Sequence, residues 1–243
     1  MNFFKALAYP FKDPKWYWKL LSTLLIAAIP VVGFFVIKGW EYEISARVRN
    51  GDYTIPDWKH FWSKFKHGLI IRMGAIFYNL PVYILIFFSV LAWVRLFTDF
   101  FALPDPTWVA FKDLFAAGFP ARIALFIGIL FYALMANILY WSGYLQYIET
   151  GKVISFFELI DNFLRSFENI WDDIIMGIMI GFMELIFFIL DAVMSGGLVF
   201  TGIGTVIAAI FVPAFTFTIL SWFKGYLYGQ LAINTLGHHG YGQ

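Results

Sequence analysis

The sequence contains no cysteine and little charge: 14% of its 243 residues are Asp, Glu, Lys or Arg, against about 25% in an ordinary soluble domain. The absence of cysteine excludes disulfides, thiolate metal sites and cysteine nucleophiles. A formal net charge of +1 gives no electrostatic support for a nucleic-acid partner. A chain this poor in charge cannot cover a water-facing surface, so we expect its surroundings to be largely lipid.

Motifs for catalysis are also lacking. The sequence has no G-x-S-x-G, H-E-x-x-H or P-loop pattern and no phosphate-cradling glycine loop. His238 and His239 are adjacent without an evident third ligand, and His60 and His67 lie on a basic amphipathic stretch. We therefore expect no metal site and no cofactor, and we predict a protein that is not an enzyme.

Apolar residues dominate instead, at 61% of the chain with a mean hydropathy of +0.74. A bilayer core about 30 Å thick needs about 20 apolar helical residues to cross it. Several stretches reach or approach this length, and they do not alternate as the strands of a membrane β-barrel do. The pattern predicts an all-α, polytopic membrane helix bundle with segments at 20–37, 73–94, 123–141, 174–194 and 198–222.

Other stretches have helical periodicity and charge on one face only. Residues 57–69 and 155–171 are predicted to lie in the membrane interface or against the bundle, and residues 1–19 form an interfacial arm. Ser155 followed by Glu158 matches a capping box, which predicts a helix start there. The charged side chains predicted to contact lipid headgroups and partners are Lys59, Lys64, Lys66, Glu158, Asp161 and Glu168.

A Gly-aromatic pair recurs where three predicted segments end, at Gly39-Trp40, Gly143-Tyr144 and Gly225-Tyr226. Each pair is followed by a further glycine that suits a helix end. Parallel repeats would place the three exits on one side of the membrane, and chance similarity among aromatic-rich helices is the alternative.

The distribution of Lys and Arg bears on how residues 20–37 meet the membrane. If this segment spans the membrane, 10 Lys and Arg residues lie on one side of it and 7 on the other. If the segment is a re-entrant hairpin with Pro30 as its hinge, 14 lie on the cytoplasmic side and 3 on the outer side. The positive-inside rule favours the hairpin, and proline favours a bend there. This topology predicts a multi-pass protein of the inner or plasma membrane with both termini in the cytoplasm.

The N-terminal third carries a recognisable set of motifs: ALAYPFKDPKW at 6–16, IPVVG at 29–33, Gly39-Trp40, RNGD at 49–52 and IPDW at 55–58. With these motifs the sequence resembles domain-of-unknown-function family 4013, over most of the chain and most strongly in its first 75 residues. The resemblance implies a bacterial or archaeal integral membrane protein. It supplies no activity and no catalytic residues.

Two carboxylates in the predicted segment 174–194 are candidate functional groups. Glu184 lies at mid-segment and shares a helix face with Gly177, Gly181 and Asp191. A proton or cation site facing the bundle interior is one interpretation. The other is a structural carboxyl group, protonated or hydrogen-bonded to Asn79, Asn137 or a hydroxyl, with Gly177 and Gly181 permitting close helix packing. We expect Asp191 to pair with Arg95 or Arg122.

The sequence therefore predicts a non-enzymatic scaffold, assembly factor or accessory subunit of a membrane complex. Its cytoplasmic amphipathic helices would contact lipid and partners, which are other membrane subunits or further copies of the chain. A small transporter or channel using Glu184 is the first alternative, and a lipid-modifying enzyme is the second.

Overall fold

The computed structural model describes residues 2–29, 31–102, 107–108, 112, 116, 119–198 and 202–237, and its regular elements are all helical over these residues. The all-α prediction is confirmed. The chain divides into two compact units. Unit 1 consists of residues 1–74 and 141–243, and unit 2 consists of residues 75–140. The helices α4 (Phe61–Phe101) and α6 (Phe119–Thr150) each contribute to both.

Among the described residues, three helices are long and apolar enough to cross a membrane, over Phe61–Phe101, Ile123–Thr150 and Ile170–Met194. They contain the predicted segments 73–94, 123–141 and 174–194. The third belongs to α8 (Ile170–Leu198), which is followed by α9 (Gly202–Gly237). Helix α9 covers the predicted segment 198–222 from residue 202 onward, and residues 199–201 lie outside the described part of the chain.

The predicted break in segment 20–37 is present. Helix α2 (Trp16–Ala27) ends before it and helix α3 (Val32–Arg49) begins after it, while Pro30 itself lies outside the described residues. The two helices pack so closely that a Cβ on Gly33 would lie 2.1 Å from the carbonyl oxygen of Ile26. Val31 has φ 64° and ψ −60°, a strained conformation for a β-branched residue. The break therefore makes a tight helical hairpin.

Residues 57–69 do not form a separate helix, contrary to the prediction. Helix α4 begins at Phe61 and continues without interruption to Phe101. The physical reason is that no proline or turn sequence separates the amphipathic stretch from the apolar one, since Leu69-Ile70-Ile71-Arg72 continues a helix. The amphipathic stretch is therefore the first part of the long helix.

The second amphipathic stretch is helical but starts later than predicted. Residues Val153–Phe156 form a short 3₁₀ turn (η2), and helix α7 covers Leu159–Glu168. The capping box does not form, because the buried Ser155 hydroxyl bonds to that of Thr150 at 2.9 Å and Glu158 accepts a bond from Gln146. Both residues are used for contacts with the end of α6.

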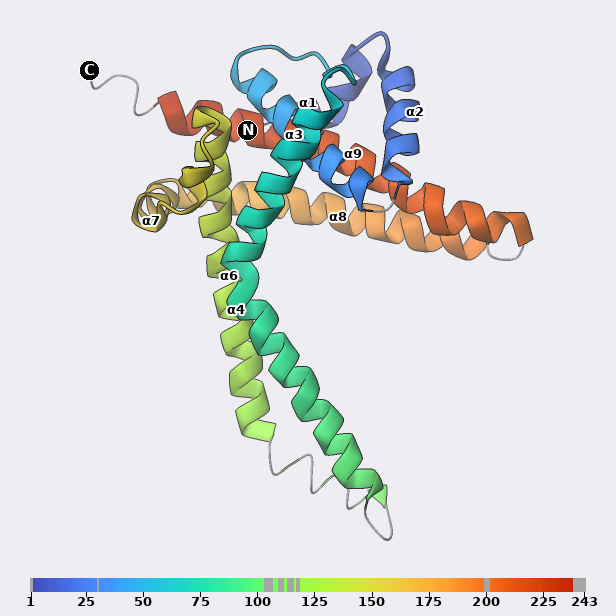
Figure 1. Ribbon diagram of the computed structural model, residues 1–243, viewed down its shortest axis with the longest axis vertical. Coiled ribbons are helices and arrows are strands. Elements are labelled where there is room, and N and C mark those ends of the chain that lie inside the picture. The colour runs from blue at the N-terminus through green and yellow to red at the C-terminus, as the bar shows by residue number, and fades with distance from the viewer. Residues whose placement is uncertain are drawn as a thin grey trace. The chain divides into compact units, whose positions relative to one another are not determined.

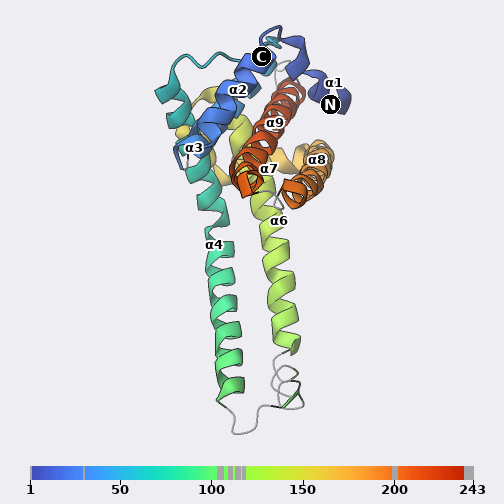
Figure 2. The ribbon, with the colours of Figure 1, turned by 90° about the vertical axis from the view of Figure 1, so that its right-hand side faces the viewer.

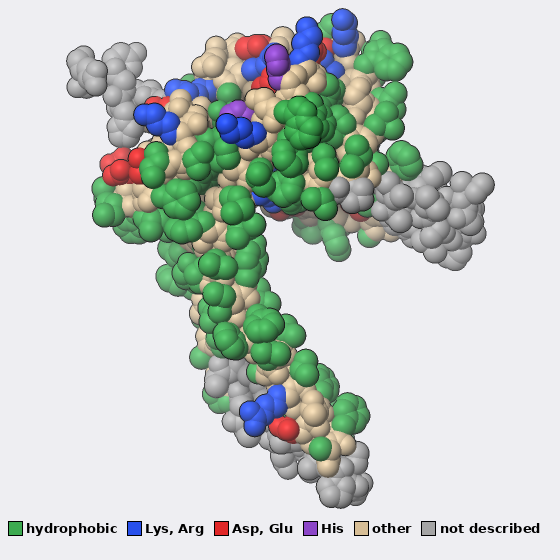
Figure 3. Space-filling view, viewed as in Figure 1, with side chains coloured by type: hydrophobic (Ala, Val, Ile, Leu, Met, Phe, Trp, Pro, Cys, Tyr) green, Lys and Arg blue, Asp and Glu red, His purple; other side chains and the backbone are tan. Residues whose placement is uncertain are grey.

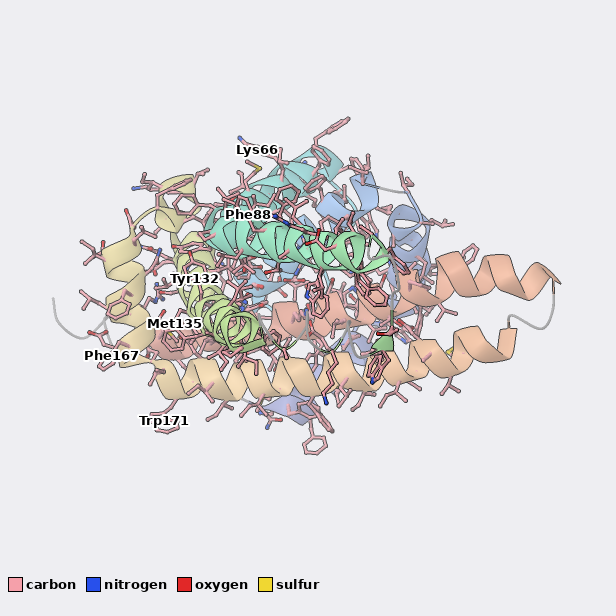
Figure 4. The ribbon with its side chains drawn as sticks, turned by 90° about the horizontal axis from the view of Figure 1, so that it is seen from below. Lys66, Phe88, Tyr132, Met135, Phe167 and Trp171 are labelled. Carbon is pink, nitrogen blue, oxygen red and sulfur yellow. The ribbon has the colours of Figure 1, made fainter. Side chains whose placement is uncertain are left out.

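The core of unit 1 forms where α3 packs against α9 and α9 runs along α8 (Figures 1 and 4). Trp40 of α3 and Trp222 of α9 are fully buried, with ring centroids 5.6 Å apart. The start of α4 crosses α3 at backbone contact: a Cβ on Gly39 would lie 1.7 Å from the carbonyl oxygen of Lys64, and one on Gly68 would lie 1.7 Å from that of Phe35. Only glycine permits this crossing.

Unit 2 holds the outer part of α4 and the first part of α6, which run lengthwise in Figure 2. Most of their side chains are exposed and apolar, as the hydrophobic surface in Figure 3 shows. Asn79 and Asn137 donate to carbonyl oxygens of their own helices, those of Ala75 and Ala133. Amide groups at membrane depth are thus satisfied locally, as lipid surroundings require.

Candidate functional site

Four helices of unit 1 bring five charged residues together: Lys38 and Glu41 of α3, Arg72 of α4, Glu184 of α8 and Lys224 of α9. We call them the charge cluster. Lys38 Nζ lies 2.7 Å from Glu41 Oε2, and the Glu41 side chain is 1% exposed. Lys224 Nζ lies 2.5 Å from Glu184 Oε1, and the Glu184 side chain is 50% exposed. One ion pair is therefore internal and the other reaches the surface.

Arg72 is held beside the other members of the charge cluster by a contact with an aromatic ring. Its guanidinium carbon lies 3.6 Å from the centroid of the Phe34 ring, which stacks on Phe217 of α9 at 5.9 Å. Such a cation–π contact is stronger when water is excluded. Lys38 is close enough to Arg72 and Lys224 to be repelled by both. The cluster thus sets three cations against two carboxylates, an excess of one positive charge.

The Glu184 side chain is half exposed and does not lie on the buried side of α8. The side of α8 that is buried in the chain carries Met176, Ile180, Met183 and Phe187. Glu184 follows Met183 and is turned about 100° away from that side by helical geometry. Its partner is Lys224, and neither Asn79 nor Asn137 takes that role.

The remaining residues of that face also differ from expectation. Asp191 accepts a hydrogen bond from the Thr216 hydroxyl of α9, a contact that the sequence did not predict. Arg95 pairs instead with Asp99 at 3.8 Å, and the side chain of Arg122 lies outside the described part. A Cβ on Gly177 would meet the Trp141 ring at 2.9 Å, whereas Gly181 has open space. Only the first glycine packs within the chain.

The three helix exits predicted from the Gly-aromatic repeat meet at one junction. At the end of α3, Arg49 Nη1 donates to the carbonyl oxygens of Ile148 and Glu149 at 3.4 and 3.1 Å. Arg165 of α7 pairs with Glu149 at 3.6 Å and donates to Thr235 Oγ1 of α9 at 3.1 Å. Arginines at helix C-terminal carbonyls are favourable because those ends carry partial negative charge. The C-terminal ends of α3, α6 and α9 therefore lie close together.

Helix α7 presents its polar side to the chain and its apolar side outward. Asn162 and Ser166 are buried, and Asn162 donates to the carbonyl oxygen of Ser155 at 2.8 Å. The outward side is apolar, and in Figure 4 the Trp171 ring points away from the chain. We call this apolar side, together with Trp171 in the first turn of α8, the outer face of α7. It consists of Ile160 (77% exposed), Phe163 (55%), Leu164 (54%), Phe167 (71%) and Trp171 (75%).

The predicted partner residues are only partly available at the surface. Lys64 is 3% exposed and pairs with Glu43 at 2.6 Å, and Glu158 is bonded to Gln146. Lys59, Lys66, Asp161 and Glu168 are exposed. Asp161 and Glu168 are seven residues apart and so follow one edge of the outer face of α7. We call these two residues the acidic edge.

The histidines do not form a metal site within the described residues, where no cluster of three or more His, Cys, Asp or Glu could hold an ion. His67 stacks on Tyr42 with centroids 4.4 Å apart, and its Nδ1 lies 2.6 Å from the Tyr147 hydroxyl. His67 therefore packs in an aromatic cluster with Tyr42 of α3 and Tyr147 of α6. His238 and His239 lie outside the described residues.

A family model described as a protein of unknown function, DUF4013, matches residues 22–163, which is more than half of the chain. The chain belongs to the DUF4013 family. No curated protein matches this DUF4013 chain, and no solved structure does. The matched stretch includes Lys38, Glu41 and Arg72 of the charge cluster and ends before Glu184 and Lys224.

Sequence reasoning found Glu184 but missed the other members of the charge cluster. A usable signal was present in the repeat, because Lys38 and Lys224 each stand directly before its Gly-aromatic pair. Equivalent positions in repeated helices tend to occupy equivalent places. The partner carboxylates could not be inferred in the same way, since Glu41 is three residues away and Glu184 is on another helix.

Replacing Glu41 by Gln should destabilise unit 1 by about 3–5 kcal/mol, because the buried Lys38 ammonium loses its counter-ion. The double variant Lys38→Met/Glu41→Gln should recover most of that loss. Denaturant unfolding in detergent, followed by tryptophan fluorescence, measures both. Equal stability of Glu41→Gln and the native chain would show that the internal ion pair is not needed.

Proposed function

We propose that this DUF4013 protein is a non-enzymatic scaffold or accessory subunit of the cell membrane. In this proposal α7 sits in the lipid interface and the acidic edge meets a partner subunit. The observation that carries it is the polarity of α7, in which the uncharged polar residues Asn162 and Ser166 are buried while the apolar side is exposed. The three candidate membrane helices support the placement in a bilayer.

The outer face of α7 needs an apolar covering. Each of its large side chains would gain about 1.5–3 kcal/mol on removal from water. An amphipathic helix lying in the boundary between headgroups and acyl chains obtains this gain without a binding pocket. Trp171 adds an interfacial anchor, since tryptophan prefers the headgroup level.

The acidic edge has a different requirement. Asp161 and Glu168 are exposed beside the outer face, while Arg165, the basic residue of α7, turns inward to Glu149. Anionic headgroups repel such an edge. A basic surface on a partner would complement it, and exposed Lys59 and Lys66 of another copy provide one such surface. The pairs would orient the partners more than stabilise them, at about 0–1 kcal/mol each.

The position of α7 in the lipid interface can be tested with single cysteines, because each introduced cysteine is a unique labelling site in this cysteine-free chain. An environment-sensitive dye at residue 160, 163 or 167 should show blue-shifted emission in liposomes and be quenched by brominated lipid. The same dye at residue 161 or 168 is the matched control and should report water. Water-like emission at all five positions would refute a lipid-seated α7.

The partner contact can be tested by reversing the acidic edge. Asp161→Lys/Glu168→Lys should dissociate the assembly purified in mild detergent, as measured by light scattering and by the subunits that co-purify. The neutral variant Asp161→Asn/Glu168→Gln should have an intermediate effect. An unchanged assembly in the charge-reversed variant would remove the acidic edge from the partner interface.

A small transporter or channel is the second candidate function, and the Glu184–Lys224 pair favours it. The pair reaches the surface near the middle of the candidate span Ile170–Met194, where a charge is costly unless it serves a purpose. Under this alternative, proteoliposomes should show ion flux that Glu184→Gln abolishes while α7 labelling stays unchanged. Absence of flux from the native protein would count against it.

A further inference from the structure

The N-terminal arm, residues 2–15, is held firmly against unit 1. It comprises α1 (Phe3–Ala8) and η1 (Pro10–Lys12) and leads into α2. The rings of Phe3 and Phe223 pack at 5.4 Å, and the Tyr9 hydroxyl donates to the carbonyl oxygen of Thr54 at 3.0 Å. The arm therefore has a defined orientation, with one side against α9 and the 52–57 loop and the other side outward.

One lysine in the first turn of α2, Lys19, joins the arm to the 52–57 loop and so fixes this orientation. Lys19 Nζ lies 2.7 Å from Asp13 and 3.2 Å from Asp57. The hydrogen bond from Lys19 lowers the pKa of the Asp57 carboxyl below its usual value, so this link persists at neutral pH. Asp13 is the only acidic residue between positions 2 and 29, and Lys19 uses it.

The outward side of the arm is consequently basic. Lys5, Lys12 and Lys15 are exposed, and none of them forms an ion pair with a described carboxylate. This gives the docked arm three outward positive charges.

The arm and the first part of α2 also expose large apolar residues. Phe4 is 79% exposed, Phe11 61% and Trp18 59%. Leu21 and Leu25 continue the exposed apolar side along α2 toward Val31 at the hairpin turn. Helix α2 has 12 residues, about 18 Å at 1.5 Å per residue. This length matches roughly one leaflet of a core about 30 Å thick.

We infer that the arm and the α2–α3 hairpin form a lipid-binding wedge selective for anionic phospholipids. The ammonium groups of Lys5, Lys12 and Lys15 contact phosphates of acidic headgroups, and the apolar side of α2 enters the same leaflet. An acidic protein would complement the lysines but would leave Phe4, Phe11 and Trp18 in water. Lipid satisfies both sets of side chains, as it does for basic aromatic interfacial segments. This surface is separate from α7, so the inference does not depend on how α7 is covered.

The test titrates the full-length protein in detergent with phosphatidylglycerol or phosphatidylcholine and counts bound lipids by native mass spectrometry. The native chain should prefer phosphatidylglycerol, and Lys5→Gln/Lys12→Gln/Lys15→Gln should lose on the order of 100-fold of that preference. This figure takes about fivefold per lysine, equivalent to about 1 kcal/mol each. Sodium chloride should weaken the preference of the native chain.

The matched control neutralises three exposed basic residues elsewhere, Arg95→Gln/Lys112→Gln/Lys152→Gln, with the same change in net charge. It should keep most of the preference. Equal losses in the two triple variants would mean that overall charge, and not the arm, selects lipid. The inference is also overturned if the native chain binds both lipids equally well. It is overturned likewise if sodium chloride does not change the lipid preference of the native chain.

Discussion

Unit 1 is organised around α3, which is enclosed between the start of α4 and the length of α9. The crossing with α4 is made at backbone distance through Gly39 and Gly68, and the contact with α9 buries Trp40 against Trp222. Several of the charged contacts described above depend on this enclosure. It brings Lys38 within reach of Arg72 and Lys224, and it places Arg49 at the end of α6. A side chain at either glycine would separate the helices that supply these groups.

The distribution of polarity in unit 1 is the reverse of that in a soluble domain. Polar and charged side chains such as Glu41, Lys64 and Asn162 are buried and bonded within the chain. Large apolar side chains on α2, α7 and α8 are exposed. Internal ion pairs and hydrogen bonds satisfy charged and polar groups that lipid could not solvate. The exposed apolar side chains suit a lipid environment better than water. Both features follow from one change of solvent.

Charge of opposite sign is carried by different surface elements. The arm presents lysines whose one nearby acid is used internally, and α7 presents acids whose one basic residue turns inward. In each case the residue of opposite charge, Asp13 in the arm and Arg165 in α7, is held in an internal ion pair and not at the surface. The same contacts that dock each element therefore also determine the charge at its exposed surface. The membership in the DUF4013 family adds no activity to this physical description.

The sequence alone determined the solvent and the fold class, because scarcity of charge and long apolar runs are properties of composition. It also determined the break in segment 20–37, since the signal at Pro30 is local. Local patterns were insufficient where an element continues or ends: α4 extends through the predicted boundary at residue 69, and α7 starts after its supposed capping box. The partners of Glu184, Asp191 and Lys64 were decided by the tertiary structure. Each pairing joins two different helices. Which side of a helix meets its neighbour depends on backbone approach at glycines such as Gly39 and Gly68, and the spacing of residues within a single helix does not reveal this.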